Sequence, residues 1–282
     1  MKEKIFKMKI LKISFIFLFF IGVGLFQITI DKTKKVSLRE ILLQELMYFP
    51  SGKFLKEIAI EYDNLLSDFV WLRAIQYYGF HLVTDRKFDY LFHIFDIITT
   101  LDPRFAGAYH FSSFCLAWDA KKPDSAIYLL KRALIYDPFN WQHYFDIGFI
   151  NYMITKNYEE AGYYFYLAAQ LPGTWKISER WAAFSYGKSP KKEFAEILWQ
   201  DIYNSTDNEQ LKKIAKRGLK VLKREKDLEY LQIAVDKFIQ NKKREPTSLL
   251  ELYKEGYIDS IPQEPFGYYY KIKDGKVIIT KR

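Results

Sequence analysis

Cysteine is almost absent from this sequence, which has one such residue, Cys115, among 282. A single cysteine cannot form a disulfide within the chain, and its neighbours Phe114 and Leu116 indicate a buried, unreactive thiol. Only four histidines are present, and none has the close spacing to a second ligand that a zinc site requires. We therefore expect neither a metal nor a cofactor.

Recognisable catalytic motifs are missing as well. The sequence contains no glycine-rich phosphate loop, no GxSxG elbow and no HExxH. The four histidines, at 81, 93, 110 and 143, each lie within aromatic segments of helical periodicity, which favours structural roles for them. The sequence thus predicts a protein without catalytic activity. An envelope enzyme that uses an acidic residue such as Asp119 or Asp146 is kept as a minor alternative.

Charge is absent from the stretch between Ile13 and Ile30. Eighteen residues of helix cover roughly 27 Å, close to the hydrocarbon thickness of a bilayer. A cleaved signal peptide is the alternative, but no convincing small-residue cleavage site follows Gly24. We predict an N-terminal region 1–36 with an uncleaved, single-pass anchor at 13–30 in a bacterial inner membrane. Lysines precede and follow the span, so the bias that places the N-terminus in the cytoplasm and the bulk in the periplasm is small.

The charge balance is basic, at +9, and 18% of the residues are aromatic. Such a charge suits an anionic surface, but it does not specify one. Lysines concentrate at 208–226, where the sequence reads NEQLKKIAKRGLKVLKREK. This segment is predicted to be a helix whose basic side is either a solvated outer face or a contact for acidic lipid headgroups or an acidic partner. Interleaved exposed aromatics are lacking, so no nucleic acid is expected.

Two helical segments are predicted after the anchor. Ser37 is followed three residues later by Glu40, a capping box that opens a helix running to Phe49. Pro50, Ser51 and Gly52 interrupt the pattern, and helical periodicity then continues without a break from Leu55 to Gly79. Residues 37–71 are assigned to a helical N-terminal cap.

Proline returns at a regular interval through the middle of the chain. Pro103, Pro138 and Pro172 are separated by 35 and 34 residues, each behind an apolar stretch. Small residues follow the same period: Gly79 and Gly148 lie 69 residues apart, which is two periods, and the pair Ala126 and Ala133 recurs 35 residues later as Ala161 and Ala168. Small residues are needed where two helices cross closely, and proline ends the second helix of each unit. The sequence predicts three units of helix, turn, helix and proline, at about 72–103, 107–138 and 141–172.

A period of about 34 residues in this pattern resembles the tetratricopeptide repeat. The resemblance implies a mainly α fold: a right-handed α-solenoid of helical hairpins over 72–226, including a degenerate fourth pair and capping helices. Phe114 and Leu91 depart from the pattern, since they stand where glycine and alanine are expected.

The same resemblance implies a concave groove that binds an extended peptide or a partner helix. Its lining is carried over from the first helix of each unit to the following residues: Arg73, Gln76, Phe80, Phe111, Cys115, Trp118, Asp119, Gln142, Phe145, Phe149, Tyr152 and Met153. Many of these are aromatic, which suits an apolar or aromatic-rich ligand. The alternative is that the segment 37–66 or the C-terminal tail of this chain fills the groove.

Residues 227–282 are predicted to be a separate small module that consists of a helix, a short second helix, an irregular stretch and a β-hairpin. Thr247 and Ser248 supply the cap of the second helix, and Asp274-Gly275 is a strong signal for a two-residue hairpin turn. Pro262, Pro265, Phe266, Gly267 and Tyr270 make this tail resemble the C-terminal portion of G-type pseudopilins of type II secretion, with Glu264 in place of an aspartate. The prepilin cleavage motif is missing, so the resemblance implies a shared small fold.

The whole chain also resembles a group of membrane-anchored bacterial tetratricopeptide proteins of undefined role. The resemblance rests on PSGKFL at 50–55 and on DFVWLRAIQYYG at 68–79. It implies a scaffold that holds an unknown protein or peptide partner at the cell envelope. The pseudopilin-like tail implies an alternative, an accessory component of a secretion or pilus-type machine.

Overall fold

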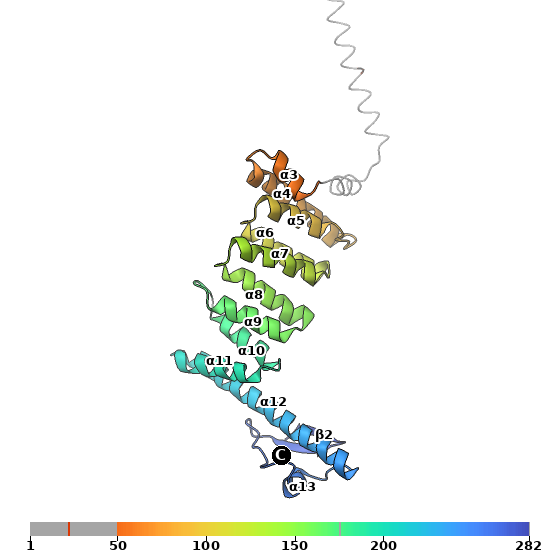
Figure 1. Cartoon of the computed structure of the whole chain (residues 1–282), viewed down its shortest axis with the longest axis vertical. Coiled ribbons are helices and arrows are strands. Elements are labelled where there is room, and N and C mark those ends of the chain that lie inside the picture. The colour runs from red at the N-terminus through yellow and green to blue at the C-terminus, as the bar shows by residue number, and fades with distance from the viewer. Residues whose placement is uncertain (1–21, 23–49, 175, 282) are drawn as a thin grey trace, which may run out of the picture.

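The computed structural model describes Gly22 and residues 50–174 and 176–281. This part of the chain is mainly helical and ends in a two-stranded antiparallel sheet. Antiparallel helix pairs follow one another along the long axis, and a long helix then leads to a small C-terminal module (Figure 1). In the described residues no helix has both the length and the apolarity to cross a bilayer. The anchor predicted at 13–30, apart from Gly22, and the helix predicted at 37–49 lie outside these residues.

The first two described helices differ in length: a short helix, α3, is followed by a long one, α4. Helix α3 spans Gly52–Ile58 and α4 spans Asp63–Val83. Between them Ile60 and Glu61 adopt φ of 45° and 70°, so the continuous helix predicted from Leu55 to Gly79 is wrong. The break lets α3 fold onto α5, where a side chain at Gly52 would come within 2.8 Å of the Thr100 Cβ. This close approach explains why glycine follows Ser51.

Three helix pairs follow the predicted period. The pairs are α4 with α5 (Leu91–Leu101), α6 (Ala106–Phe114) with α7 (Pro123–Tyr136), and α8 (Trp141–Ile150) with α9 (Tyr158–Ala169). Each of the three prolines lies just after the second helix of its pair, as predicted. The turn inside each pair holds one basic residue with positive φ, and these residues, Arg86, Lys121 and Lys156, recur every 35 positions.

The first helices of the second and third pairs end in a wider turn. The π-helical segments η1 (Cys115–Asp119) and η2 (Asn151–Thr155) extend α6 and α8. Such π-turns are rare and frequently occur at functional sites. Both of them contribute side chains to the surface described below.

Small residues make the predicted close contacts at most positions. Ala126, Ala133, Ala161 and Ala168 are fully buried, and the helices that carry them contact the first helix of the next pair. A Cβ on Gly148 would lie 2.9 Å from the Phe165 ring, whereas a Cβ on Gly79 meets nothing within 4 Å. The predicted equivalence of these two glycines is therefore wrong.

A fourth pair and a long helix close the array. Helix α10 spans Ile177–Gly187, α11 spans Lys192–Ser205 and α12 spans Glu209–Lys242. The sequence predicts a helix boundary near 226, but α12 passes through it, because neither glycine nor proline interrupts that stretch. Asn208 caps α12 through its side-chain oxygen, which accepts the N–H groups of Gln210 and Leu211.

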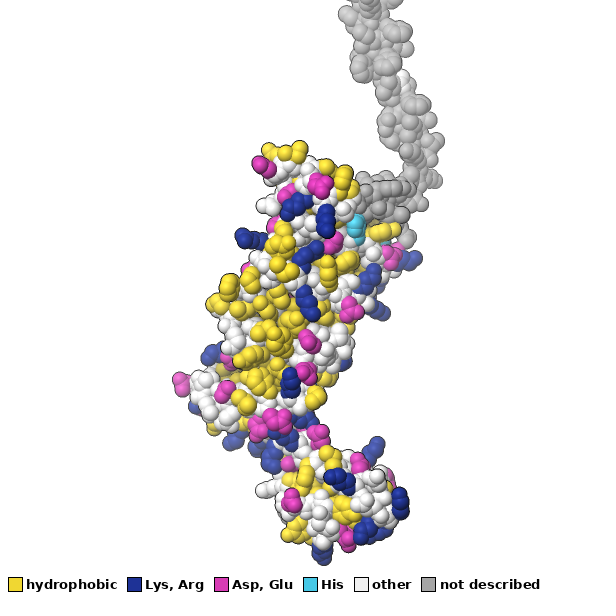
Figure 2. All heavy atoms as spheres, in the orientation of Figure 1, with side chains coloured by type: hydrophobic (Ala, Val, Ile, Leu, Met, Phe, Trp, Pro, Cys, Tyr) yellow, Lys and Arg dark blue, Asp and Glu magenta, His cyan; other side chains and the backbone are white. Residues whose placement is uncertain are grey.

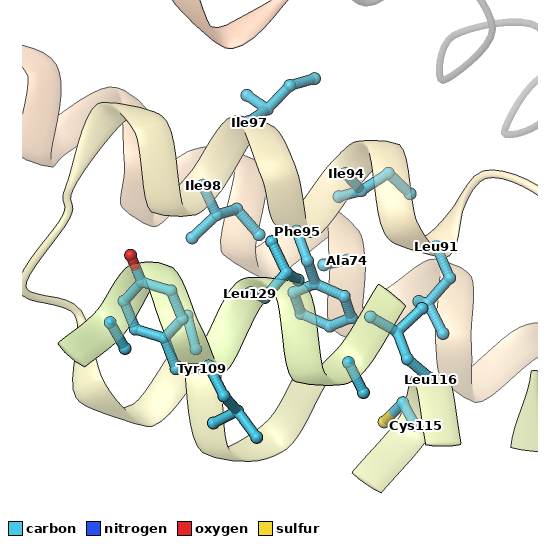
Figure 3. Close-up of a cluster of buried hydrophobic side chains, with 14 of the residues drawn as sticks. Ala74, Leu91, Ile94, Phe95, Ile97, Ile98, Tyr109, Cys115, Leu116 and Leu129 are labelled. Carbon is cyan, nitrogen blue, oxygen red and sulfur yellow. The ribbon is translucent and has the colours of Figure 1, made fainter. Parts of the chain in front are cut away.

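The core consists of three clusters. The first, shown in Figure 3, joins α3 to α8, with Phe95 and Leu129 among its fully buried members. The second joins α9 to the first half of α12, and the third joins the second half of α12 to the C-terminal module. The module thus has a core of its own, centred on Phe238 and Leu252.

The C-terminal module contains α13 (Leu249–Lys254) and strands β1 (Tyr269–Lys273) and β2 (Lys276–Thr280). The predicted cap and hairpin are confirmed: Ser248 Oγ accepts the Glu251 N–H, and Asp274 and Gly275, both at positive φ, join the paired strands.

Buried Glu264 organises the turn that leads to the hairpin. Its carboxylate accepts the N–H groups of Phe266 and Tyr268 at 2.7 and 2.8 Å and pairs with Arg224 Nε at 2.5 Å. Although burial raises the pKa of Glu264, the backbone N–H of Tyr268, Arg224 and the N–H of Phe266 hold it below its usual value. The guanidinium of Arg224 also lies 4.3 Å from the centre of the Phe266 ring.

Candidate functional site

A row of six aromatic side chains joins three consecutive helix pairs. We call it the aromatic row; its members are Phe114, Trp118, Phe145, Phe149, Tyr152 and Trp181. Trp118 stacks on Phe149 with ring centres 5.7 Å apart, and Phe149 meets Trp181 edge-on at 5.8 Å. On the face drawn in Figure 2, hydrophobic side chains gather over α8 to α10, the region from which most of the row comes. The row is therefore a continuous aromatic surface rather than a set of separate rings.

Two adjoining cavities lie at the C-terminal end of the aromatic row. One has a volume of about 330 Å³ and is lined by Tyr152, Ile177, Arg180, Trp181 and Phe184. The other has a volume of about 310 Å³, and its lining includes Tyr152, Phe184, Trp199, Gly218 and Leu222. Tyr152 and Phe184 belong to both, so together the cavities form one apolar binding surface. Each volume is at the lower end of the range of small-ligand sites and suits a large side chain.

The second cavity depends on a close contact between α11 and α12. A Cβ on Gly218 would lie 2.5 Å from the indole of Trp199, so only glycine allows this ring to lie flat against α12. Phe184 meets the same indole edge-on, with ring centres 4.7 Å apart. This packing fixes the floor of the cavity with rigid rings.

Charged groups lie at the edge of the cavities. The Lys188 ammonium lies 4.7 Å from the centre of the Tyr152 ring and 5.2 Å from that of Tyr158. A hydrogen bond to Tyr152 raises the pKa of Lys188, which therefore stays cationic. Burial raises the pKa of Glu225 across the cavity. The Nε of Arg180 is buried and has no hydrogen-bond partner among the described residues. An apolar surface with these groups at its edge can bind a side chain and hydrogen-bond the backbone that carries it.

Two polar contacts hold neighbouring pairs together beside the aromatic row. His110 Nδ1 lies 2.6 Å from the buried Asp146 carboxylate, which links α6 to α8. Its hydrogen bond to Asp146 raises the pKa of His110, and burial raises that of Asp146. The Tyr78 hydroxyl donates to Asp119 at 2.9 Å, which links α4 to η1. Both acids considered for an enzyme are thus bonded across helices.

Cys115 is also buried. Burial raises the pKa of its thiol to about 12, so the thiol is protonated at neutral pH and is a poor nucleophile. Among the described residues no group of three or more His, Cys, Asp and Glu side chains could hold a metal ion.

The predicted groove residues are spread over three different environments. Trp118, Phe145, Phe149 and Tyr152 belong to the aromatic row, and exposed Met153 follows Tyr152. Asp119, Cys115 and Gln142 make polar or buried contacts beside the row, with Gln142 Nε2 lying 3.0 Å from His110 Nδ1.

The remaining predicted residues lie away from the cavities. Phe111 packs against Trp71 and Tyr78 in the interior, with ring centres 5.3 Å apart in each case. Arg73 and Gln76 are exposed on α4, and Phe80 is half-buried there.

Apart from Tyr152, the two cavities are lined by residues that the sequence analysis did not single out as site residues. Trp181 and Phe184 lie on α10, Trp199 on α11, and Gly218 on α12. The sequence assigns these segments to a degenerate fourth pair and a basic capping helix. A signal was available in the glycine at 218, which stands inside an otherwise strong helix-forming stretch and marks a close packing contact.

Parts of this chain that could fill the groove pack elsewhere where they are described. Residues 50–66 include α3, which contacts α5. The C-terminal module packs on the second half of α12. The residues that line the two cavities all come from η2, α10, α11, α12 and Lys188.

Comparisons with known proteins give no family assignment. No protein-family model matches this chain. No curated protein sequence matches it either.

Proposed function

We propose that this chain is a non-enzymatic, membrane-anchored scaffold of the tetratricopeptide type that binds a protein partner at the cell envelope. The solenoid is supported by the prolines after each pair and by the positive-φ residues Arg86, Lys121 and Lys156 at a constant interval. The anchor is proposed from the uncharged stretch 13–30, and the lysines that precede it support an N-terminus in the cytoplasm with the helical region in the periplasm.

The observation that carries this proposal is the aromatic row ending in two apolar cavities. Rings that are already packed against one another lose little side-chain entropy when a partner binds. A large apolar side chain entering either cavity would displace water from Tyr152, Phe184 and their neighbours, and buried aromatic anchors of this kind carry most of the energy of protein interfaces. We therefore expect the partner to present an apolar segment to η2 and α10.

Site-specific photo-crosslinking in cells tests the proposal. A benzophenone amino acid would replace Phe184, which lines both cavities, or Met153, which follows Tyr152 in the chain; these side chains are 46% and 42% exposed. Ile135 on α7 is 75% exposed and lines neither cavity, so the same replacement there is the matched control. We expect one protein to be crosslinked from Phe184 and Met153 and not from Ile135.

A second measurement separates binding from proximity. Trp181→Ala removes a wall of the first cavity and a neighbour of Phe149, so it should abolish the crosslink from Met153 while the protein remains folded by circular dichroism. Crosslinks of equal yield from all three positions, or a crosslink unaffected by Trp181→Ala, would contradict binding at this surface.

The proposed topology has its own test. Alkaline phosphatase fused after Arg282 should be active, because that end of the chain is expected in the periplasm. Green fluorescent protein fused at the same position should not fluoresce, because it would be exported together with the chain. The opposite pattern would place the aromatic row in the cytoplasm and change which proteins can be its partners.

The C-terminal module supports a second candidate, an accessory component of a secretion or pilus-type machine. The supporting observation is a helix followed by a Glu264-centred turn and a hairpin, which is the arrangement that the pseudopilin resemblance implies. Deleting 244–282 should then impair secretion while crosslinking from Phe184 persists. Normal secretion by a strain that lacks the whole protein would remove this candidate.

A further inference from the structure

Helix α4 has a second apolar face that no described element covers. Its Val70, Ala74 and Tyr77 are buried against the rest of the array. On the opposite side Leu65, Phe69, Leu72 and Val83 are 52%, 59%, 56% and 79% exposed. Monomeric proteins rarely expose a contiguous stripe of large apolar side chains, and such stripes commonly mark interfaces.

The exposed side chains follow a heptad pattern. We call the positions 65, 69, 72, 76, 79 and 83 the α4 seam; their spacing alternates between three and four residues. That alternation is the a/d pattern of a two-stranded coiled coil, with Phe69, Gln76 and Val83 at a and Leu65, Leu72 and Gly79 at d. The polar Gln76 at an a position is the type of residue that fixes register in such pairs. Gly79 belongs to this seam, which explains why its Cβ position faces open space.

The α4 seam lies at the N-terminal end of the helix stack. Every later first helix is covered by the pair before it, but α3, which precedes α4, packs on α5 instead. Figure 1 shows α3 and α4 together at this end. Terminal repeats of a helical array normally have a polar outer face. An apolar outer face at this end therefore calls for a partner.

We propose that two copies of this chain pair in parallel through the α4 seam. Charge complementarity identifies both the partner and its direction. Asp68 occupies a g position and Arg73 the e position five residues later, the two positions that face each other between strands of a parallel dimer. Asp68 of one copy then faces Arg73 of the second, and the two-fold axis creates this contact twice. Arg73 also donates a hydrogen bond to Gln76, a member of the α4 seam, at 3.4 Å.

The geometry suits this pairing. The 21 residues of α4 give a helix of roughly 32 Å, enough for three heptads. Because the buried side of α4 already holds the helix in place, pairing does not have to order it. This inference does not depend on what the aromatic row binds, since the α4 seam shares no residue with the row or its cavities.

Disulfide trapping of the full chain tests both pairing and direction. Leu65 lies near the start of the α4 seam, so a Leu65→Cys variant in mild detergent should form a 65–65 disulfide and run as a dimer without reductant. Ile135→Cys on exposed α7 is the control; on the same denaturing gel it should form no disulfide-linked dimer, and neither should the parent chain with its buried Cys115, whose copies pair without a covalent bond. A disulfide between Leu65→Cys and Val83→Cys chains in place of the 65–65 bond would refute the parallel direction.

Sedimentation of variants tests the contacts themselves. Phe69→Lys with Leu72→Lys should give a monomer, whereas Ile135→Lys should leave a dimer; all three side chains are exposed, so folding is unaffected. Asp68→Arg should weaken dimerisation roughly fivefold, and adding Arg73→Asp should restore it. A monomeric parent chain would overturn the proposal. If the parent chain were monomeric and cysteines introduced along the α4 seam were nevertheless protected from thiol reagents, the seam would instead be covered by residues 37–49 or by the membrane surface.

Discussion

Replacing glycine by alanine at two positions should have effects of opposite sign. Gly148 and Gly79 lie 69 residues apart, two periods of the repeat, and both are inside helices. In a helix interior alanine is favoured over glycine by about 1 kcal/mol. At Gly79 a new Cβ meets nothing within 4 Å, so the free energy of unfolding should rise by roughly that amount.

At Gly148 the cost of overpacking exceeds the gain in helix propensity. The new Cβ would lie 2.9 Å from Cδ1 of Phe165, closer than side chains tolerate. That ring cannot move away easily, because it is fully buried between Phe145 and Trp181, whose centres lie 5.0 and 5.5 Å from its own. Overpacking of this kind costs about 1–3 kcal/mol, which exceeds the gain in helix propensity over most of that range. Gly148→Ala should therefore be destabilising.

Urea unfolding of the full chain in mild detergent measures both effects. Helical signal at 222 nm and tryptophan fluorescence report the transition, and the midpoint is compared between variants because an array need not unfold in two states. We expect the midpoint to rise for Gly79→Ala and to fall for Gly148→Ala. Equal stabilisation by both substitutions would show that the Gly148 contact is not tight and that the sequence-based equivalence of the two glycines was adequate.

Three further predictions concern titratable groups. NMR titration should show a pKa of His110 above 6.5, and this pKa should fall in Asp146→Asn. The stabilisation from the His110–Asp146 hydrogen bond is present below pH 6.5 and is lost as the pH rises through the raised pKa of folded His110. The Cys115 thiol should react with a disulfide reagent only after unfolding, and reaction with the native chain at pH 8 would contradict its burial. Because the folded pKa of Glu264 lies below its usual 4.5, its contribution to the C-terminal module is present above pH 4.5 and is lost on acidification; Glu264→Gln should remove this dependence from the thermal unfolding of the module.

The periodicity of the sequence predicted the helix pairs in the middle of the chain, but it could not predict which side chains pack against one another. Pro138 and Ala126 stand where the pattern requires, because helix ends and small contact residues follow from local chemistry. The break at Ile60 was missed, since nothing local favours positive φ at a β-branched residue; the docking of Gly52 on α5 compensates for it. Long-range contacts decide such positions, and spacing alone does not report them.

The candidate site was predicted in part for the same reason. Aromatic residues of the second and third units, such as Trp118 and Phe149, were found because the repeat places them on the first helices. The cavities were missed because α10, α11 and α12 line them, and the sequences of these segments no longer follow the repeat; the second cavity also depends on α12 lying against Trp199. Arg73 and Gln76 were assigned to the groove by register, but α4 is the first helix of the first pair, and no earlier pair lies within the described residues.

The two ends of the array differ in a way that bears on assembly. At the C-terminal end α12 buries Ala215, Gly218 and Leu222 against the last pair and turns lysines such as Lys213 and Lys216 outward. That end is closed by a polar outer face, as a terminal repeat requires. At the N-terminal end the outer face of α4 carries Leu65, Phe69 and Leu72, and none of the described residues covers it in this way. If copies associate only through the N-terminal end, the assembly is limited to a dimer, because pairing the α4 seam with itself leaves no further apolar end exposed. A scaffold built in this way would present two aromatic rows to its partner, and a bivalent partner would then bind more tightly than each row does alone.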